Sequence, residues 1–197
     1  MHVRERFDVP LDWPVDVAID YHPRKPIRIL AVATDKIDRK WVVWEYNKVG
    51  NYKMAAEAFI KWAKSNHIRV ENIVCDPLAK GDPNSDLKEE STYEKIDNIL
   101  FPYGYSLDTA NKDEAGGITA INEILIMENE EPGLFVFRDC VETVEHIEGW
   151  MWQENGKPAR EEEDMCENLY RIVLLDTKYT EPLTRKKELA VVNWKVV

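Results

Sequence analysis

The stretch Val15-Asp16-Val17-Ala18-Ile19-Asp20 decides the fold of this chain, because it has the apolar pattern of a buried strand and ends in a carboxylate. Pro23 follows closely and prevents the strand from continuing into a helix. A second apolar run, Ile73-Val74-Cys75, ends in the same way at Asp76. We therefore expect both aspartates to stand at the mouth of one sheet, each at the end of its strand.

A third acidic group lies near the C-terminus, where Glu163, Asp164 and Glu167 open a helix predicted over residues 162–175. Helical spacing gives this helix an apolar face formed by Met165, Leu169, Ile172 and Val173. It also gives a polar face formed by Asp164, Glu167, Asn168 and Arg171. The apolar face would anchor the helix on the sheet and turn the acids toward Asp20 and Asp76. Such a group of carboxylates can bind divalent cations.

The order of elements predicts an α/β fold with a mixed central sheet. Strands over 27–33 and 41–46 complete an antiparallel three-strand meander with the first strand. A helix after Asn51 then leads to a parallel strand over 72–75. The remaining expected elements are a polar loop over 77–92, helices over 93–100, 117–127 and 141–152, short strands over 105–107 and 134–137, a loop over 153–160, and a strand or ordered arm over 189–194. This order resembles an RNase H-like fold flanked by helices.

Composition indicates one folded domain without a membrane span. The chain has 197 residues, and its apolar content of 44% with seven Trp and eight Tyr is typical of a globular protein. No run approaches the ~20 apolar residues that a bilayer requires, and Met1–Arg6 lacks the apolar core of a signal peptide. Three cysteines without Cys-x-x-Cys spacing argue against zinc and fit a reducing compartment.

The net charge of −11 argues against a broad nucleic-acid surface, because neutralising phosphates draws on a surplus of Lys and Arg. The candidate DNA contacts are local groups of basic residues: Arg24, Lys25 and Arg28, then Lys112, then Arg185, Lys186 and Lys187. We expect weak, salt-sensitive DNA binding from such patches. The alternative interpretation is that each group consists of solvated turn or helix-start residues.

Six segments carry a resemblance to a known family: Phe7–Pro14, Val17–Tyr21, Asn72–Pro77, Asn111–Ile118, Leu134–Cys140 and Glu163–Arg171. In this order the chain resembles the C-terminal nuclease domain of the large terminase subunit of tailed phages. The resemblance implies a metal-dependent endonuclease that cuts double-stranded DNA with little sequence preference. Its setting would be viral genome packaging in the cytoplasm of the infected host cell.

The resemblance also implies a site with two ions, Mg²⁺ or Mn²⁺, which are hard cations that prefer carboxylate oxygens. Asp20 would bridge both ions, with Asp76 and either Asp164 or Glu167 completing the site, and metal-bound water would attack the phosphorus. The chain departs from the family in lacking a glycine soon after the first aspartate. Its late helix also places Glu167 where the family has Asp, so the choice among Glu163, Asp164 and Glu167 stays open.

The ATPase half of the family is not expected in this sequence, because no Gly-x-x-x-x-Gly-Lys-Ser/Thr phosphate loop occurs. We therefore predict one nuclease domain over 1–197, with residues 1–14 a remnant of the interdomain linker. The implied partners are double-stranded DNA, the ATPase domain of the same polypeptide, the small terminase subunit and the portal protein.

Two other functions stay open. One is another RNase H-like enzyme, such as a resolvase or transposase core. The other is a non-catalytic acidic interaction module, since Asp before Pro commonly forms turns and acids commonly begin helices. That module would bind no metal and would tolerate replacement of Asp20.

Overall fold

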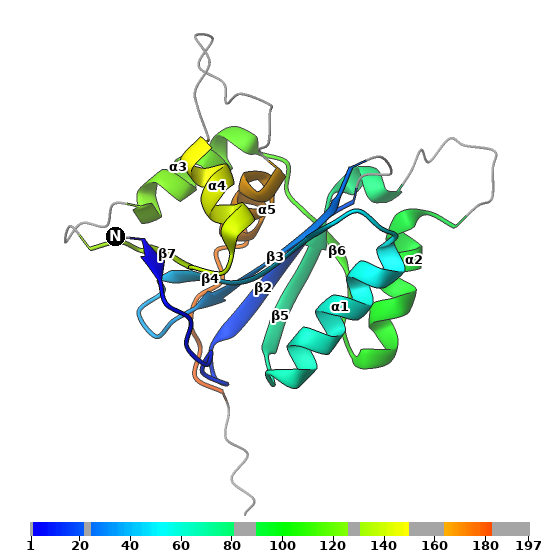
Figure 1. Ribbon diagram of the computed structural model, residues 1–197, viewed down its shortest axis with the longest axis horizontal. Helices are drawn as coiled ribbons and strands as arrows, with labels where there is room; N and C mark the ends of the chain where they lie inside the picture. Colours follow the sequence, from blue (N-terminus) through cyan, green and yellow to red (C-terminus); the bar gives the residue numbers. More distant parts are fainter. Residues whose placement is uncertain (1, 22–24, 81–89, 126–130, 150–163, 183–197) are drawn as a thin grey trace, which may run out of the picture.

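The computed structural model describes residues 2–21, 25–80, 90–125, 131–149 and 164–182. Within them a seven-stranded sheet has the order β1-β7-β4-β3-β2-β5-β6 (Figure 1). The strands are β1 (Val3–Arg4), β2 (Pro14–Asp20), β3 (Ile27–Thr34), β4 (Lys40–Lys48), β5 (Arg69–Cys75), β6 (Asp108–Thr109) and β7 (Leu134–Phe137). The helices are α1 (Tyr52–Ser65), α2 (Thr92–Leu100), α3 (Glu114–Leu125), α4 (Val141–Gly149) and α5 (Asp164–Val173), with short 3₁₀ turns over Pro77–Lys80 and Phe101–Tyr103.

The pairing of the strands confirms the predicted mixed sheet. Strands β2, β3 and β4 form the antiparallel meander. Strand β5 is parallel to β2, β6 is parallel to β5, and β7 is parallel to β4. The chain therefore has the RNase H-like strand arrangement that the order of elements predicted.

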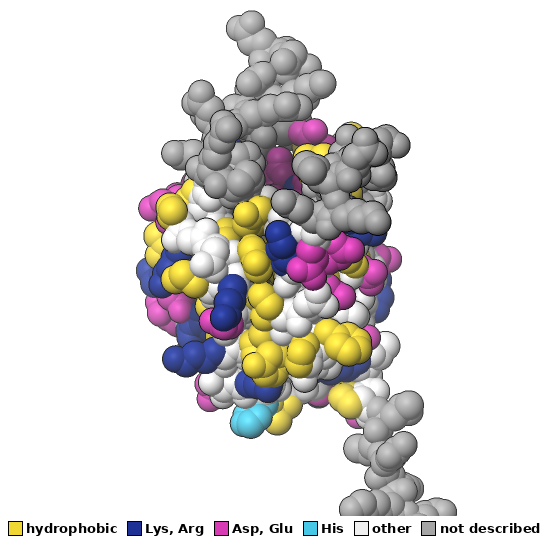
Figure 2. Space-filling model, turned by 90° about the vertical axis from the view of Figure 1, so that its right-hand side faces the viewer, with side chains coloured by type: hydrophobic (Ala, Val, Ile, Leu, Met, Phe, Trp, Pro, Cys, Tyr) yellow, Lys and Arg dark blue, Asp and Glu magenta, His cyan; other side chains and the backbone are white. Residues whose placement is uncertain are grey.

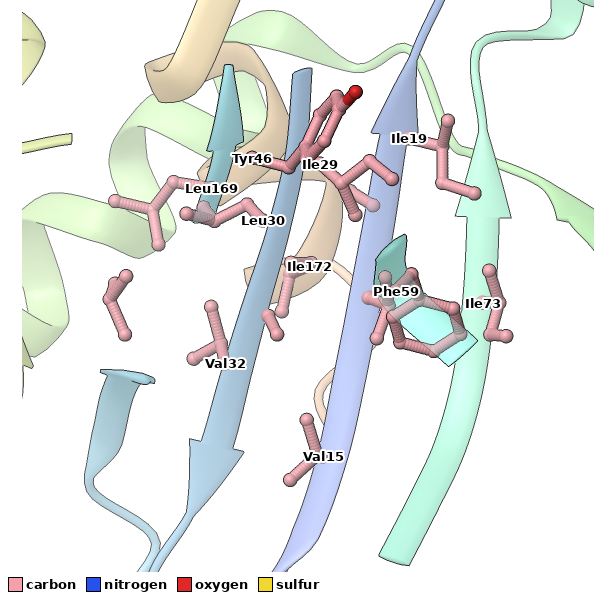
Figure 3. Packing of buried hydrophobic residues seen from close by; sticks show 14 of the residues in the cluster. Val15, Ile19, Ile29, Leu30, Val32, Tyr46, Phe59, Ile73, Leu169 and Ile172 are labelled. Atoms are coloured by element: carbon pink, nitrogen blue, oxygen red, sulfur yellow. The ribbon is translucent and has the colours of Figure 1, made fainter. Parts of the chain in front are cut away.

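Helices cover both faces of the sheet, with α1 and α2 on one side and α3, α4 and α5 on the other (Figure 1). Strand β3 is buried from Ile27 to Thr34 without exception, and β2 is buried up to Ile19. Phe59 reaches the sheet from α1, and Leu169 and Ile172 reach it from α5 (Figure 3). All three side chains are fully buried, so α5 is anchored by the apolar face that its periodicity predicts. No helix among the described residues is both long and apolar enough to cross a membrane.

Two of the boundaries that differ from the sequence prediction have a local structural reason. The short strand lies at Asp108–Thr109 instead of 105–107, because those two residues pair with Val74 and Cys75 at the end of β5. Helix α3 begins three residues early, since the Asp113 side chain accepts the Gly116 N–H and so caps the helix ahead of its glycines.

The N-terminal segment contributes a strand that the sequence did not predict. Val3 and Arg4 pair in parallel with Val136 and Phe137 at the edge of the sheet. This segment belongs to the residues predicted as a linker remnant. The expected strand or arm over 189–194, the loop over 153–160 and the middle of the loop over 77–92 lie outside the described residues.

Candidate metal centre

The register of two parallel strands brings Asp20 and Asp76 together. Ile19 of β2 pairs with Cys75 of β5, so the next residue on each strand stands at the same edge of the sheet. Asp76 also forms a turn, because its Oδ1 accepts the Leu78 N–H at 2.7 Å. The turn at Asp76 therefore leaves its other carboxylate oxygen free of this turn and does not exclude a role in a site.

Helix α5 adds Glu167 as the third carboxylate. Asp20, Asp76 and Glu167, the carboxylate triad, each offer one oxygen, and these oxygens lie within 4.8 Å of one another. All three side chains are partly exposed. Three carboxylates at this spacing suit a hard divalent cation such as Mg²⁺ or Mn²⁺, so the donor set fits the predicted ions.

Asp164 lies in the same region but has other partners. Its carboxylate pairs with the Arg28 guanidinium and lies 3.6 Å from Lys25 Nζ. The structure therefore brings Glu167 into the triad and surrounds Asp164 with basic groups. Glu163, the third candidate from the late helix, lies outside the described residues.

A buried arginine stands among the triad carboxylates. Arg171 is 2% exposed, and its Nη1 lies 3.2 Å from Asp20 Oδ1. Its Nη2 lies 2.8 Å from Asp76 Oδ2 and 2.7 Å from Glu167 Oε2. Helical spacing places Arg171 on the polar face of the helix, but no role was predicted for it. The available signal was its spacing of four residues from Glu167, which favours an ion pair on one helix face.

Burial sets the electrostatics of the triad. Desolvation raises the pKa of Asp20 and of Glu167, and the other carboxylates add to the effect, while Arg171 opposes it. The pKa of Asp76 is also raised by burial, but hydrogen bonds from Lys112 and a backbone N–H, with the charge of Arg171, lower it overall. Arg171 itself is buried, which lowers its pKa, yet the three carboxylates raise it overall. The positive charge of Arg171 thus offsets the repulsion among the triad carboxylates.

The triad opens into a cavity of about 510 Å³. Lys112 reaches across it and donates to Asp76 Oδ1 at 2.8 Å. The other residues lining the cavity are Tyr21, Lys25, Leu78, Glu114, Asp164, Tyr170 and Arg171. The carboxylates are therefore accessible to an ion and to a substrate from one side.

The predicted DNA-contacting residues that the structure describes gather around this cavity. Lys25 and Lys112 line it with roughly half-exposed side chains, whereas Arg28 is buried against Asp164. Arg24 and the group 185–187 lie outside the described residues. On the visible part of the face in Figure 2, basic side chains are scattered among acidic ones and form no broad basic patch.

Glu45 of β4 is an acidic residue whose hydrogen bonds lie at the beginning of α4. Its oxygens accept the N–H groups of Glu142 and Thr143 and the Thr143 hydroxyl at 2.7–3.0 Å. Glu45 therefore caps the beginning of α4 and stands outside the triad.

Comparison with solved structures shows the fold. The chain aligns with the nuclease domain of the P22 large terminase over 88% of its own length and 87% of that chain, with 20% identity and a TM-score of 0.65. It aligns with the large terminase of a thermophilic bacteriophage over 88% of its length, with 17% identity and a TM-score of 0.67, and spans 41% of that chain. The chain thus has the fold of phage large terminase nuclease domains. No protein-family model and no curated protein matches it.

Proposed function

We propose that this chain is the nuclease domain of a phage large terminase and cuts double-stranded DNA with little sequence preference during genome packaging in the infected host cell. The observation that carries the proposal is the convergence of Asp20, Asp76 and Glu167 within 4.8 Å of one another, in a fold shared with the P22 nuclease domain. Two strand-end carboxylates and a helical carboxylate would hold divalent cations, which stabilise the negative charge that develops on the attacking and leaving oxygens in phosphodiester hydrolysis.

The triad would hold two ions, Mg²⁺ or Mn²⁺, and Asp20 would be a ligand to both. When bound, these ions stabilise the negative charge on the reacting oxygens and lower the pKa of bound water. Glu167 takes the role of the third ligand, because its oxygen lies with those of Asp20 and Asp76. Asp164 instead fixes Arg28 and Lys25 beside the cavity.

Lys25 and Lys112 are the groups best placed to approach DNA phosphates. Their side chains are 53% and 44% exposed and line the cavity, so each can leave its carboxylate partner when a phosphate enters. Arg28 is too buried for such a contact, and we assign it to orienting Asp164. Contacts with the backbone alone carry no sequence information, which accords with cutting of little sequence preference.

The rest of the packaging machinery would position the DNA. The chain spans 41% of the large terminase of the thermophilic bacteriophage, and we propose that an ATPase domain belongs to the same polypeptide. The small terminase subunit and the portal protein are the further partners proposed. Because the net charge is −11, we expect the isolated domain to cut slowly and to lose activity steeply as salt rises.

A second function has one observation in its favour. Arg171 already pairs with all three carboxylates, as would suit a non-catalytic module that kept the fold without its metal. That module would bind no divalent ion at the triad. A resolvase or transposase core would instead show a preference for branched or specific DNA.

Nicking of supercoiled plasmid in Mn²⁺, Mg²⁺ or EDTA tests the proposal, with the wild type compared with Asp20→Asn. We expect metal-dependent cutting that the substitution abolishes. Asp139→Asn is the matched control, because this exposed carboxylate pairs with Arg6 away from the cavity, and its cutting should equal that of the wild type. Equal cutting by Asp20→Asn and the wild type would refute the assignment of the site.

A further inference from the structure

Arg171 lies among the triad carboxylates, and it pairs with all three of them. Its guanidinium contacts one oxygen of each triad member at 2.7–3.2 Å. The side chain is almost fully buried, and its Nη1 also lies 3.2 Å from Asn168 Oδ1. Few arrangements other than a close cation permit three carboxylates to gather this tightly, because like charges in a half-buried site repel one another.

Neighbouring basic groups extend the same charge balance. Lys112 pairs with Asp76, and Arg28 and Lys25 pair with Asp164, so Asp164 and each member of the triad have a cationic partner. Of these cations, Arg171 alone contacts all three members of the triad in the described part of the chain. Arg171 is also the most deeply buried of them.

We propose that Arg171 is a built-in counter-ion that competes with the divalent ion for the triad, so that its guanidinium leaves at least one carboxylate when metal binds. The inference rests on the proposed metal site. An ion such as Mg²⁺ must approach carboxylate oxygens to about 2.0–2.1 Å, and one oxygen of each triad carboxylate already lies within hydrogen-bond distance of Arg171. The affinity of the triad for a metal ion is therefore lowered by the free energy needed to separate Arg171 from the carboxylates.

The opposite role for Arg171 makes the opposite prediction. If Arg171 only held the carboxylates in place for the metal, its removal would weaken metal binding, because the ligands would spread apart. If Arg171 competes, its removal strengthens binding. Even in the dielectric of water, repulsion between a unit charge and a divalent ion about 4 Å away corresponds to roughly a thirtyfold change in affinity.

Calorimetric titration of the chain with Mn²⁺ distinguishes these roles, using the wild type, Arg171→Gln, Arg28→Gln and Asp20→Asn. We expect Arg171→Gln to bind Mn²⁺ roughly thirtyfold more tightly than the wild type. Arg28→Gln is the matched control, because it removes a buried guanidinium that contacts Asp164 instead of the triad, and it should change affinity much less. Asp20→Asn should lose binding.

Each other outcome has a defined meaning. Equal or weaker binding by Arg171→Gln, with binding still lost in Asp20→Asn, overturns the competition and leaves the metal site standing. If neither the wild type nor Arg171→Gln shows Mn²⁺ binding that is lost on replacement of Asp20, the metal site and the inference are both overturned. If Arg171→Gln fails to fold in EDTA, folding restored by Mn²⁺ supports competition, and failure to fold in Mn²⁺ as well contradicts it.

Discussion

Replacing Glu167 and Asp164 one at a time should separate the third metal ligand from its neighbour on the same helix. Both are acids on the polar face of α5, and each substitution, Glu167→Gln or Asp164→Asn, removes one negative charge. Glu167 contributes an oxygen to the triad, whereas Asp164 pairs with Arg28 and Lys25. We expect Glu167→Gln to lose metal-induced stabilisation and Asp164→Asn to retain it.

The expected size of the effect follows from linkage between binding and folding. Metal at a hundred times its Kd stabilises the folded state by about 2.7 kcal/mol. In a chain of 197 residues that corresponds to a rise in melting temperature of roughly 5–10 °C. A hundredfold loss of affinity in Glu167→Gln leaves about 0.4 kcal/mol, a rise of roughly 1 °C.

In EDTA, Asp164→Asn should lose more stability than Glu167→Gln. Asp164→Asn leaves the buried Arg28 guanidinium without its anionic partner, which costs about 1–3 kcal/mol. Glu167→Gln leaves Arg171 with Asp20 and Asp76, so its cost should stay below about 1 kcal/mol.

Thermal unfolding of the three proteins in EDTA and in Mn²⁺ measures both effects. The assignment of Glu167 fails if Glu167→Gln keeps the full metal-induced rise. It fails equally if Asp164→Asn loses that rise while remaining folded in EDTA. If each substitution alone abolishes the metal-induced rise, both acids are ligands and α5 must be rotated differently about its axis.

Two further predictions concern the frame around the site. Burial raises the pKa of Asp35, but hydrogen bonds from Trp41 and from its own turn lower this pKa overall. Asp35→Asn should therefore reduce the free energy of unfolding by about 1–3 kcal/mol at pH 7. The difference should shrink as the pH falls through the lowered pKa, and urea unfolding at neutral and acid pH will measure it. A Cβ at Gly117 would lie 2.6 Å from Tyr170 Cβ on α5, so Gly117→Ala should lower the free energy of unfolding by about 1–3 kcal/mol. Gly116→Ala should cost less, because its Cβ would meet only a flexible side chain. Equal stability of the two variants in thermal unfolding would contradict this packing.

Local patterns were sufficient for most of the fold. The alternation and length of the apolar runs located β2, β3 and β4, and the helix before β5 required that strand to be parallel. Strand β1 could not be found in this way, because two residues have no measurable period and their partner strand is more than 130 residues away. The position of β6 was missed by a few residues because pairing with the end of β5 determines it.

The candidate site likewise has a part that local sequence predicts and a part that it does not. Asp20 and Asp76 were predictable, since each ends a strand and parallel strands of one sheet end at the same edge. The third acid was not, because Glu163, Asp164 and Glu167 occupy one turn of a helix. Which of them faces the triad depends on the rotation of α5 about its axis, and contacts such as that between Gly117 and Tyr170 determine this rotation.

The sequence by itself determined that this chain builds a mixed sheet with two strand-end aspartates and an acid-bearing helix, because periodicity and strand ends are local properties. Only the tertiary structure decided that Glu167 joins the aspartates, that Arg28 and Lys25 pair with Asp164, and that Arg171 is buried among three carboxylates. Charge pairing of this kind depends on distances between elements far apart in the chain, and those distances exist only after the layers have packed.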